Sequence, residues 1–332
     1  MAIKNLKQRS FGDGLLVNHQ ALTKLDEVHE MIDWAALEYL LKDRHNKPKG
    51  EKGWPPLMMF KALLLQTWYQ LSDPQLEDQI ARDLLFRRFM GLDVLESVPD
   101  HSTLWRFRQQ LTGDLWQKLF NEINDQLSKK SLYIKTGQVS IIDASVIQAK
   151  QNRPNKGVNQ QNTQDPEAGY NVKKGSDGKL KVTYGYKAHV AVEEDGFIKA
   201  IVYSAGNEHD SLFLAELLSG NESAVYADSA YQSAKHDEML AQMGVKNCIL
   251  ERAYRNKPLN SNQKNRNRLH SSVRCIVERV FGVLKLHYNM GQARYLGLAR
   301  NATSLGLICM AYNLKRGLAI QRLSVCPEQN CA

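Results

Sequence analysis

The chain has 332 residues, enough for two domains, and its 43% hydrophobic and 24% charged residues are typical of a globular protein. That composition excludes wholesale disorder. Five cysteines without zinc-ligand or Cys-x-x-Cys spacing exclude a disulfide framework and a zinc finger. A formal net charge of +9 favours a polyanionic partner, most often nucleic acid, although such a balance also occurs in ordinary soluble proteins.

No targeting or membrane segment is evident in the sequence. The first residues lack the apolar core of a signal peptide, and the apolar runs are too short to span a bilayer. We therefore predict a cytoplasmic protein with no membrane partner.

Residues 20–130 show the apolar periodicity of short helices separated by sharp turns. Apolar residues recur at helical spacing over 57–71 after a proline pair. Ser72-Asp73-Pro74 supplies an N-cap and a first-turn proline for a second helix over 75–82. A third helix over 84–90 should end at Gly91, which suits a helix C-cap.

A fourth helix should begin at Pro99–Thr103 and carries Arg106 and Arg108. These arginines either face a DNA groove or lie on the solvated side of a structural helix, and the sequence favours neither reading. We predict a helical, helix-turn-helix-like domain over residues 1–130 that serves DNA binding or dimerisation.

From about residue 138 the pattern changes to alternating strands and helices. The polar segment 150–180, rich in Gln, Asn, Lys and Gly, predicts a flexible excursion or a long hairpin. The order of the remaining elements predicts a mixed α/β sheet flanked by helices. We expect strands at 139–142, 184–192, 197–203, 224–227 and 246–250, and helices at 210–219, 233–243 and 270–287.

The domain division follows from this change of pattern. We expect a second domain over residues 131–322 with a flexible or hairpin insert at 150–183, followed by a tail at 323–332.

Positive charge is concentrated between residues 251 and 300, where only Glu251 and Glu278 are acidic. A solvated helix face usually mixes both signs, so this stretch suggests a bound anion. Its basic residues are Arg252, Arg255, Lys257, Lys264, Arg266, Arg268, Arg274, Arg279, Lys285, Arg294 and Arg300.

Two of the predicted strands end in an aspartate, in the segments Ile141-Ile142-Asp143 and Tyr226-Ala227-Asp228. Either aspartate alone is more often a turn former or a helix cap. Together, carboxylates held at a sheet edge suit magnesium, which prefers hard oxygen ligands. Two such ions about 4 Å apart can promote an in-line phosphoryl displacement.

A third carboxylate lies on the predicted helix 270–287, between two cations. Spacings of four and seven residues place Arg274, Glu278 and Lys285 on roughly one face. The pattern could be an ordinary salt-bridge stripe. It equally suits a metal-binding carboxylate flanked by cations for phosphates.

With these residues the chain resembles the DDE transposases of bacterial insertion sequences, whose catalytic core has the RNase H-like fold. Weaker local matches are Pro99–Thr103, Asp165–Ala168, Tyr184–His189 and Asn207–Asp210. The resemblance covers roughly residues 45–320 and implies an α/β, RNase H-like mixed sheet flanked by helices, preceded by the helical domain.

The resemblance also implies a function. Asp143, Asp228 and Glu278 would be the catalytic and metal ligands for two Mg²⁺ ions, with Mn²⁺ as a substitute. Arg274 and Lys285 would grip DNA phosphates. The enzyme would hydrolyse double-stranded DNA at the transposon's inverted-repeat ends and then join the 3′-OH to target DNA, as a nucleoid-associated homodimer or higher oligomer.

The chain departs from the related families at one position. They place a tyrosine three residues before the arginine, where this chain has Ser271. In those relatives the tyrosine helps to hold a phosphate, so the resemblance does not carry that contact over to this chain. His189 and His209-Asp210 suggest additional metal ligands, but packing and helix capping explain them better.

Two other functions fit the same residues. A nuclease without strand transfer needs the same carboxylates. A DNA-binding regulator would use the helical N-terminus and keep the second domain only as a structural element.

Overall fold

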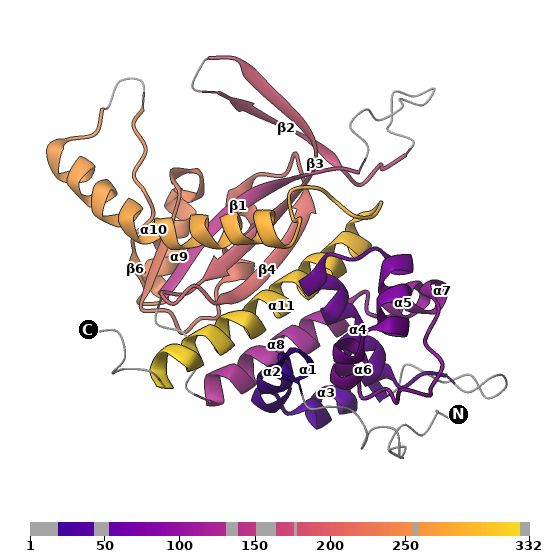
Figure 1. Ribbon diagram of the computed structural model, residues 1–332. Coiled ribbons are helices and arrows are strands. Elements are labelled where there is room, and N and C mark those ends of the chain that lie inside the picture. The colour runs from indigo at the N-terminus through magenta and orange to yellow at the C-terminus, as the bar shows by residue number, and fades with distance from the viewer. Residues whose placement is uncertain are drawn as a thin grey trace. The chain divides into compact units, whose positions relative to one another are not determined.

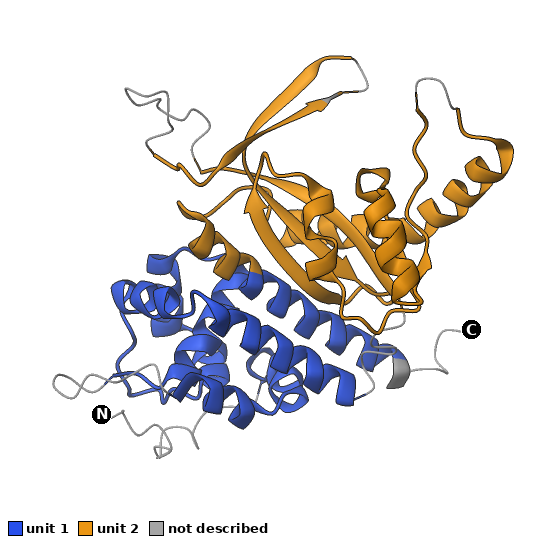
Figure 2. Ribbon diagram, turned by 180° about the vertical axis from the view of Figure 1, so that it is seen from behind, with its two compact units in different colours: residues 1–132, 306–332 blue, residues 133–305 orange. Residues whose placement is uncertain are grey.

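The computed structural model divides the chain into two units, which are described separately (Figure 2). Unit 1 comprises residues 1–132 and 306–332, and unit 2 comprises residues 133–305. The structure describes residues 19–42, 53–130, 139–150, 164–175, 178–254 and 258–325. Residues 151–163 of the predicted insert, and residues 326–332 of the predicted tail, lie outside these ranges.

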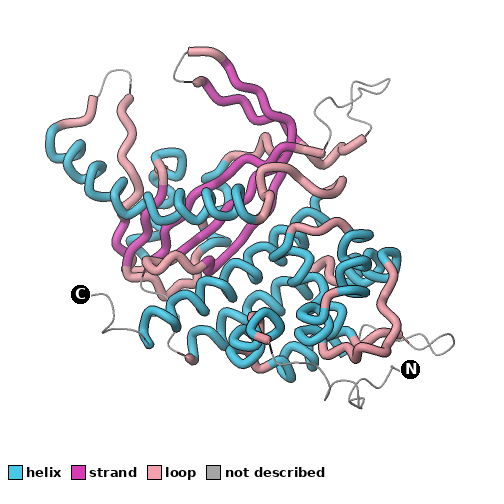
Figure 3. Tube along the Cα trace, viewed as in Figure 1, coloured by secondary structure: helices cyan, strands magenta, loops and turns pink. Residues whose placement is uncertain are grey.

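Unit 1 is helical in all its described elements except for single bridge residues (Figure 3). The predicted helices over 57–71, 75–82 and 84–90 and the helix after Pro99 are all present. Its helices are α1 (Gln20–Thr23), α2 (Asp26–Met31), α3 (Trp34–Leu41), α4 (Pro56–Tyr69), α5 (Asp73–Arg82), α6 (Leu84–Met90), α7 (His101–Gln110) and α8 (Asp114–Lys129), and the greater part of α11 (Leu298–Val325) joins them.

The helix ends in unit 1 are set by local side-chain chemistry, as the sequence predicts. Ser72 and Gln75 form a reciprocal capping box at the start of α5, and Asp100 caps α7. Gly91 ends α6 in the left-handed conformation at φ 73°, which costs little without a side chain.

The C-terminal part of α11 packs within unit 1. Trp68 donates its indole N–H to the carbonyl of Ala311 at 2.9 Å, and Asn313 donates to Asn124 at 2.8 Å. A Cβ on Gly306 would lie only 2.3 Å from the Trp116 ring, so this approach requires glycine. The structure therefore groups residues 306–322 with the helical unit, whereas we had expected them in the second domain.

Unit 2 is built around a six-stranded mixed sheet (Figure 1). Its strands are β1 (Val139–Gln148), β2 (Gly169–Lys174), β3 (Leu180–Val192), β4 (Ile198–Ala205), β5 (Ala224–Ala227) and β6 (Lys246–Asn247). The main order is β4–β3–β1–β5–β6, antiparallel among the first three and parallel from β1 onward, and β2 pairs with the first half of β3.

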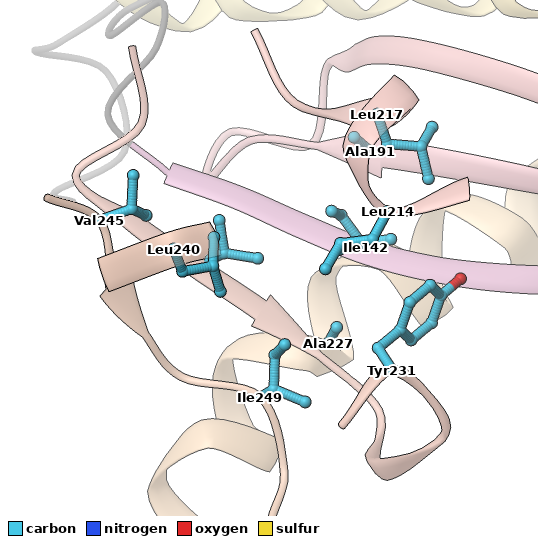
Figure 4. Packing of buried hydrophobic residues seen from close by; sticks show 10 residues of the cluster. Ile142, Ala191, Leu214, Leu217, Ala227, Tyr231, Leu240, Val245 and Ile249 are labelled. Carbon is cyan, nitrogen blue, oxygen red and sulfur yellow. The ribbon is translucent and has the colours of Figure 1, made fainter. Parts of the chain in front are cut away.

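Side chains alternate between the two faces of this sheet, so each face packs against different elements. Ile142 and Ala227 face a buried apolar cluster with Leu214, Tyr231 and Leu240, which come from short helices after β4 and β5 and from α9 (Ala234–Gln242) (Figure 4). The opposite face of β1 and β5 meets α10 (Ser261–His287), whose His270 ring lies edge-on to Tyr226.

Several local expectations differ from the structure. The strand predicted over 246–250 is only the two-residue β6, Lys246–Asn247. β1 continues through Asp143 to Gln148 because it pairs with β3 from Ile141 to Gln148, so Asp143 lies within the strand. The predicted helix over 210–219 is two short 3-10 helices, Asp210–Phe213 and Ala215–Leu217. Helix α10 begins nine residues earlier than the predicted 270, at the Asn260 capping box.

The hairpin alternative for the 150–183 insert holds at residues 169–174 and 180–183, where β2 and the start of β3 form a two-stranded ribbon. Gly185, at its root, permits close backbone approach, since a Cβ there would meet the Ile147 carbonyl at 2.0 Å. Over the described residues, no helix combines the length and apolar character needed to cross a bilayer.

Candidate active site

Strand register brings the two predicted aspartates together. In the parallel pairing of β1 with β5, Ile142 is opposite Ala227, so the next residues, Asp143 and Asp228, emerge side by side. Both point away from the apolar cluster that Ile142 and Ala227 face, because neighbouring residues of a strand alternate. They therefore lie on the face of the sheet that α10 covers.

The third carboxylate comes from α10. This helix buries Val277, Val280, Phe281 and Leu284 along one side. Arg274 and Glu278 are one turn apart on a neighbouring stripe, and the Arg274 Nη2 to Glu278 Oε1 distance is 3.5 Å. The predicted common face of these two residues is confirmed.

One guanidinium links all three carboxylates. Nη2 of Arg274 lies 3.3 Å from Asp143 Oδ2, and Nη1 lies 4.0 Å from Asp228 Oδ1. Arg274 is 11% exposed, whereas Asp143, Asp228 and Glu278 are 22%, 46% and 56% exposed. Nε of Arg274 is buried without a hydrogen-bond partner, so this cation is held by long, shared contacts.

The two aspartates are also held by their own backbone. Asp143 Oδ1 accepts a hydrogen bond from the Ala144 N–H at 2.9 Å, and Asp228 Oδ1 accepts one from the Ser229 N–H at 2.6 Å. Burial raises the pKa of Asp143 above its ordinary value, and Arg274 and the Ala144 N–H oppose that rise. Arg274 therefore favours the charged form of the Asp143 carboxyl, against the effect of burial.

The donor chemistry of this cluster suits magnesium. All three side chains offer carboxylate oxygens, and a positive charge already lies within 4.0 Å of each of them. Among the described residues, no three acidic, histidine or cysteine side chains stand in a ready-made metal-binding arrangement. The guanidinium of Arg274 lies between the carboxylates.

The other predicted DNA contacts separate into two kinds. Lys285 and Arg106 are exposed. Arg108 is 3% exposed and binds Asp73 at 2.6 Å and Gln66 at 2.7 Å, so the structural reading of this residue replaces the groove-facing one. The physical reason is its helical position, because it shares a stripe with the buried residues Leu104, Phe107 and Leu111.

The histidines are structural. His189 is fully buried and hydrogen-bonds Ser204 Oγ at 2.8 Å, and burial lowers its pKa to about 4. His209 caps a short helix through Ser211, as the capping interpretation predicts. Asp210 forms an ion pair with Lys187 at 2.8 Å.

The segment Asp165–Ala168 also has a structural role. Asp165 accepts a hydrogen bond from the Tyr186 hydroxyl at 2.5 Å and another from the Gly297 N–H at 3.1 Å. Glu167 accepts one from the Leu298 N–H at 2.7 Å. These contacts tie the root of the ribbon to the first turn of α11.

A mixed sheet with two carboxylates on adjacent parallel strands, and a third on a helix across its face, defines the RNase H-like class of nucleic-acid-processing domains. The sequence of unit 2 agrees with this class, because residues 134–314 match the family described as "Transposase DDE domain". Residues 16–110 match the family described as "Transposase domain (DUF772)". The chain belongs to the DDE transposases of insertion sequences.

Proposed function

We propose that this transposase cuts double-stranded DNA at transposon ends and joins the released 3′-OH to target DNA, with Asp143, Asp228 and Glu278 as its catalytic carboxylates. The observation that carries the proposal is the convergence of these three side chains on the single guanidinium of Arg274. Carboxylates from three separate segments would repel one another, so their gathering favours a cationic ligand.

Each residue has a role in this reaction. Asp143 and Asp228 would hold the metal ions, and Glu278 would complete one of the two sites. When bound, two Mg²⁺ ions supply Lewis-acid stabilisation of the attacking and leaving oxygens. Arg274 and Lys285 bind DNA phosphates near the cut. Water and then the 3′-OH are the successive nucleophiles, so no covalent bond to the protein forms.

The first test is cleavage of a labelled duplex that carries the element's own end, with wild type beside Asp228→Ala. We expect magnesium-dependent nicking that leaves a 3′-OH, lost in the variant while DNA binding persists. Equal cleavage by both proteins would mean that the reaction takes place at another site. Binding without any cleavage by the wild type would favour a DNA-binding regulator.

A nuclease of the same fold is the second candidate, since it uses the same carboxylates. A duplex with a pre-cut 3′-OH end, mixed with a supercoiled plasmid, separates the two. Joined product indicates strand transfer, and cleavage without joined product indicates a nuclease.

We also propose at least a dimer on DNA, because two transposon ends must be processed together. Light scattering of the protein with its end duplex should give the mass of two or more chains. A strictly monomeric complex that contains both ends would contradict this.

A further inference from the structure

The ribbon formed by β2 and the first half of β3 has two chemically different faces. In its antiparallel register Lys173 is opposite Lys181, and Asn171 is opposite Thr183. Because paired residues share a face, these four side chains form one polar, basic face. The other face carries the exposed apolar residues Tyr170, Val172, Leu180 and Val182.

The lysine pair is unfavourable by itself. Like charges directly opposite each other on a ribbon repel. Lys173 and Lys181 are both exposed, and within the described ranges neither forms an ion pair with an acidic side chain. Lysine on an exposed strand can discourage pairing with other chains, but that effect does not require two lysines opposite each other.

The ribbon continues β3, and β3 also pairs with β1 at Asp143. Helix α10 contacts β3, and the ribbon extends beyond the rest of the sheet (Figure 1). Lys285 is exposed as a residue, but partial burial of its side chain lowers its pKa. The nearby charges of Lys173 and Lys181 lower this pKa further, whereas Asp143 raises it. The three lysines are therefore close enough to influence one another, and Lys285 links them electrostatically to Asp143.

We propose that Lys173 and Lys181, together with Lys285, form a phosphate-binding arm that holds the backbone of the DNA duplex next to the cleaved position. This inference rests on the proposed function and extends the DNA contact from α10 to the ribbon. Lysine ammonium groups are point charges that bind phosphates without reading base edges. The arm therefore acts on any duplex held at the site, whatever its sequence.

The test is the salt dependence of DNA binding by Lys173→Gln/Lys181→Gln, measured by fluorescence anisotropy without divalent metal. Each lost phosphate contact lowers the slope of log affinity against log salt concentration by about 0.9, so the double variant should lose about 1.8. The same loss is expected on the element's end duplex and on an unrelated duplex of equal length. The variant should keep the wild-type circular dichroism and Tm, because both side chains are exposed.

The control is Lys235→Gln, which removes an exposed lysine from α9. Since α9 covers the other face of the sheet, this control should keep the wild-type slope. A wild-type slope in the ribbon variant, or an equal loss of slope per removed lysine in the two variants, would contradict the proposed arm.

Magnesium-dependent nicking by the wild type, measured on the same samples, separates the two proposals. If the wild type nicks DNA and the ribbon variant keeps the wild-type salt slope, the proposed function stands and the phosphate-binding arm is contradicted. If the salt slope falls only in the ribbon variant and the wild type does not nick DNA, the phosphate-binding arm is supported and the proposed reaction is contradicted.

Discussion

Arg108 in unit 1 and Arg274 in unit 2 both lie beside carboxylates, and the two differ in how completely they are bound. Arg108 in unit 1 is 3% exposed and makes two short contacts with Asp73, at 2.6 and 3.1 Å, and one with Gln66. Arg274 in unit 2 is shared among three carboxylates at 3.3 to 4.0 Å, and its Nε has no partner. A complete network stabilises one conformation, whereas a shared, incomplete one can exchange its partners for a ligand.

The largest effect should come from removing one charge at the Arg274 cluster. We expect Glu278→Gln to lower the rate of magnesium-dependent cleavage at least about 10³-fold, because a metal ligand is lost while the shape is kept. Tm should change little, since Glu278 is 56% exposed.

Glu238→Gln on α9 is the matched control for this variant, and it should cleave at the wild-type rate. Cleavage by Glu278→Gln at that same rate would remove Glu278 from the active site.

The same kind of deletion in unit 1 should affect stability instead. Asp73→Ala leaves Arg108 buried with its charge partner removed, which costs about 3 kcal/mol and lowers Tm by roughly 6–12 °C. Asp78→Ala, an exposed acid on the same helix, is the control and should leave Tm nearly unchanged. Thermal unfolding followed by circular dichroism measures both. A small effect of Asp73→Ala would mean that Gln66 alone satisfies the arginine.

Replacing Arg274 tests whether its guanidinium stands where the metal would bind. In EDTA, Arg274→Gln should lower Tm by roughly 3–8 °C, because three carboxylates then face one another without a cation. Added Mg²⁺ should raise the Tm of the variant more than that of the wild type, since the ion no longer competes with the guanidinium. Equal Mg²⁺-induced shifts in a thermal-shift assay would show that Arg274 does not stand where the metal binds.

The smallest expected effect on Tm comes from Glu193, whose carboxyl group is buried without hydrogen-bond partners. Both carboxyl oxygens of Glu193, in the β3–β4 turn, are buried without partners, and burial raises its pKa from 4.5 to about 7. Because the folded state holds this proton more tightly than the unfolded chain does, the resulting stability is fully present below about pH 4.5 and is lost as the pH rises through about 7.

Glu193→Gln should therefore unfold several degrees above the wild type at pH 8 and close to it at pH 4. Parallel pH profiles of Tm for the two proteins would contradict this.

The helix ends of unit 1 and the burial of Arg108 follow from local sequence patterns. The helix starts at Ser72 and Asp100 and the stop at Gly91 follow from local hydrogen bonding and backbone geometry, so they were predictable. The position of Arg108 on the stripe of Leu104, Phe107 and Leu111 already indicated burial. Arg106 lies off that stripe and is exposed.

Other features depended on residues far apart in the chain. Nothing local shows that β1 continues past Asp143, because its last residues are held by pairing with β3. The lysine pair of the ribbon was equally hidden, since it depends on the register that places Lys173 opposite Lys181.

By itself the sequence determined the kinds of residue at the candidate site, the order of the strands and helices that carry them, and the common helix face of Arg274 and Glu278. These follow from spacings of a few residues, which local geometry converts directly into position. Only the tertiary structure decided that Asp143 and Asp228 emerge side by side, that one guanidinium meets three carboxylates, and that the end of α11 joins the helical unit. The physical reason is that strand register and helix packing are fixed by contacts between distant segments, which no local spacing encodes.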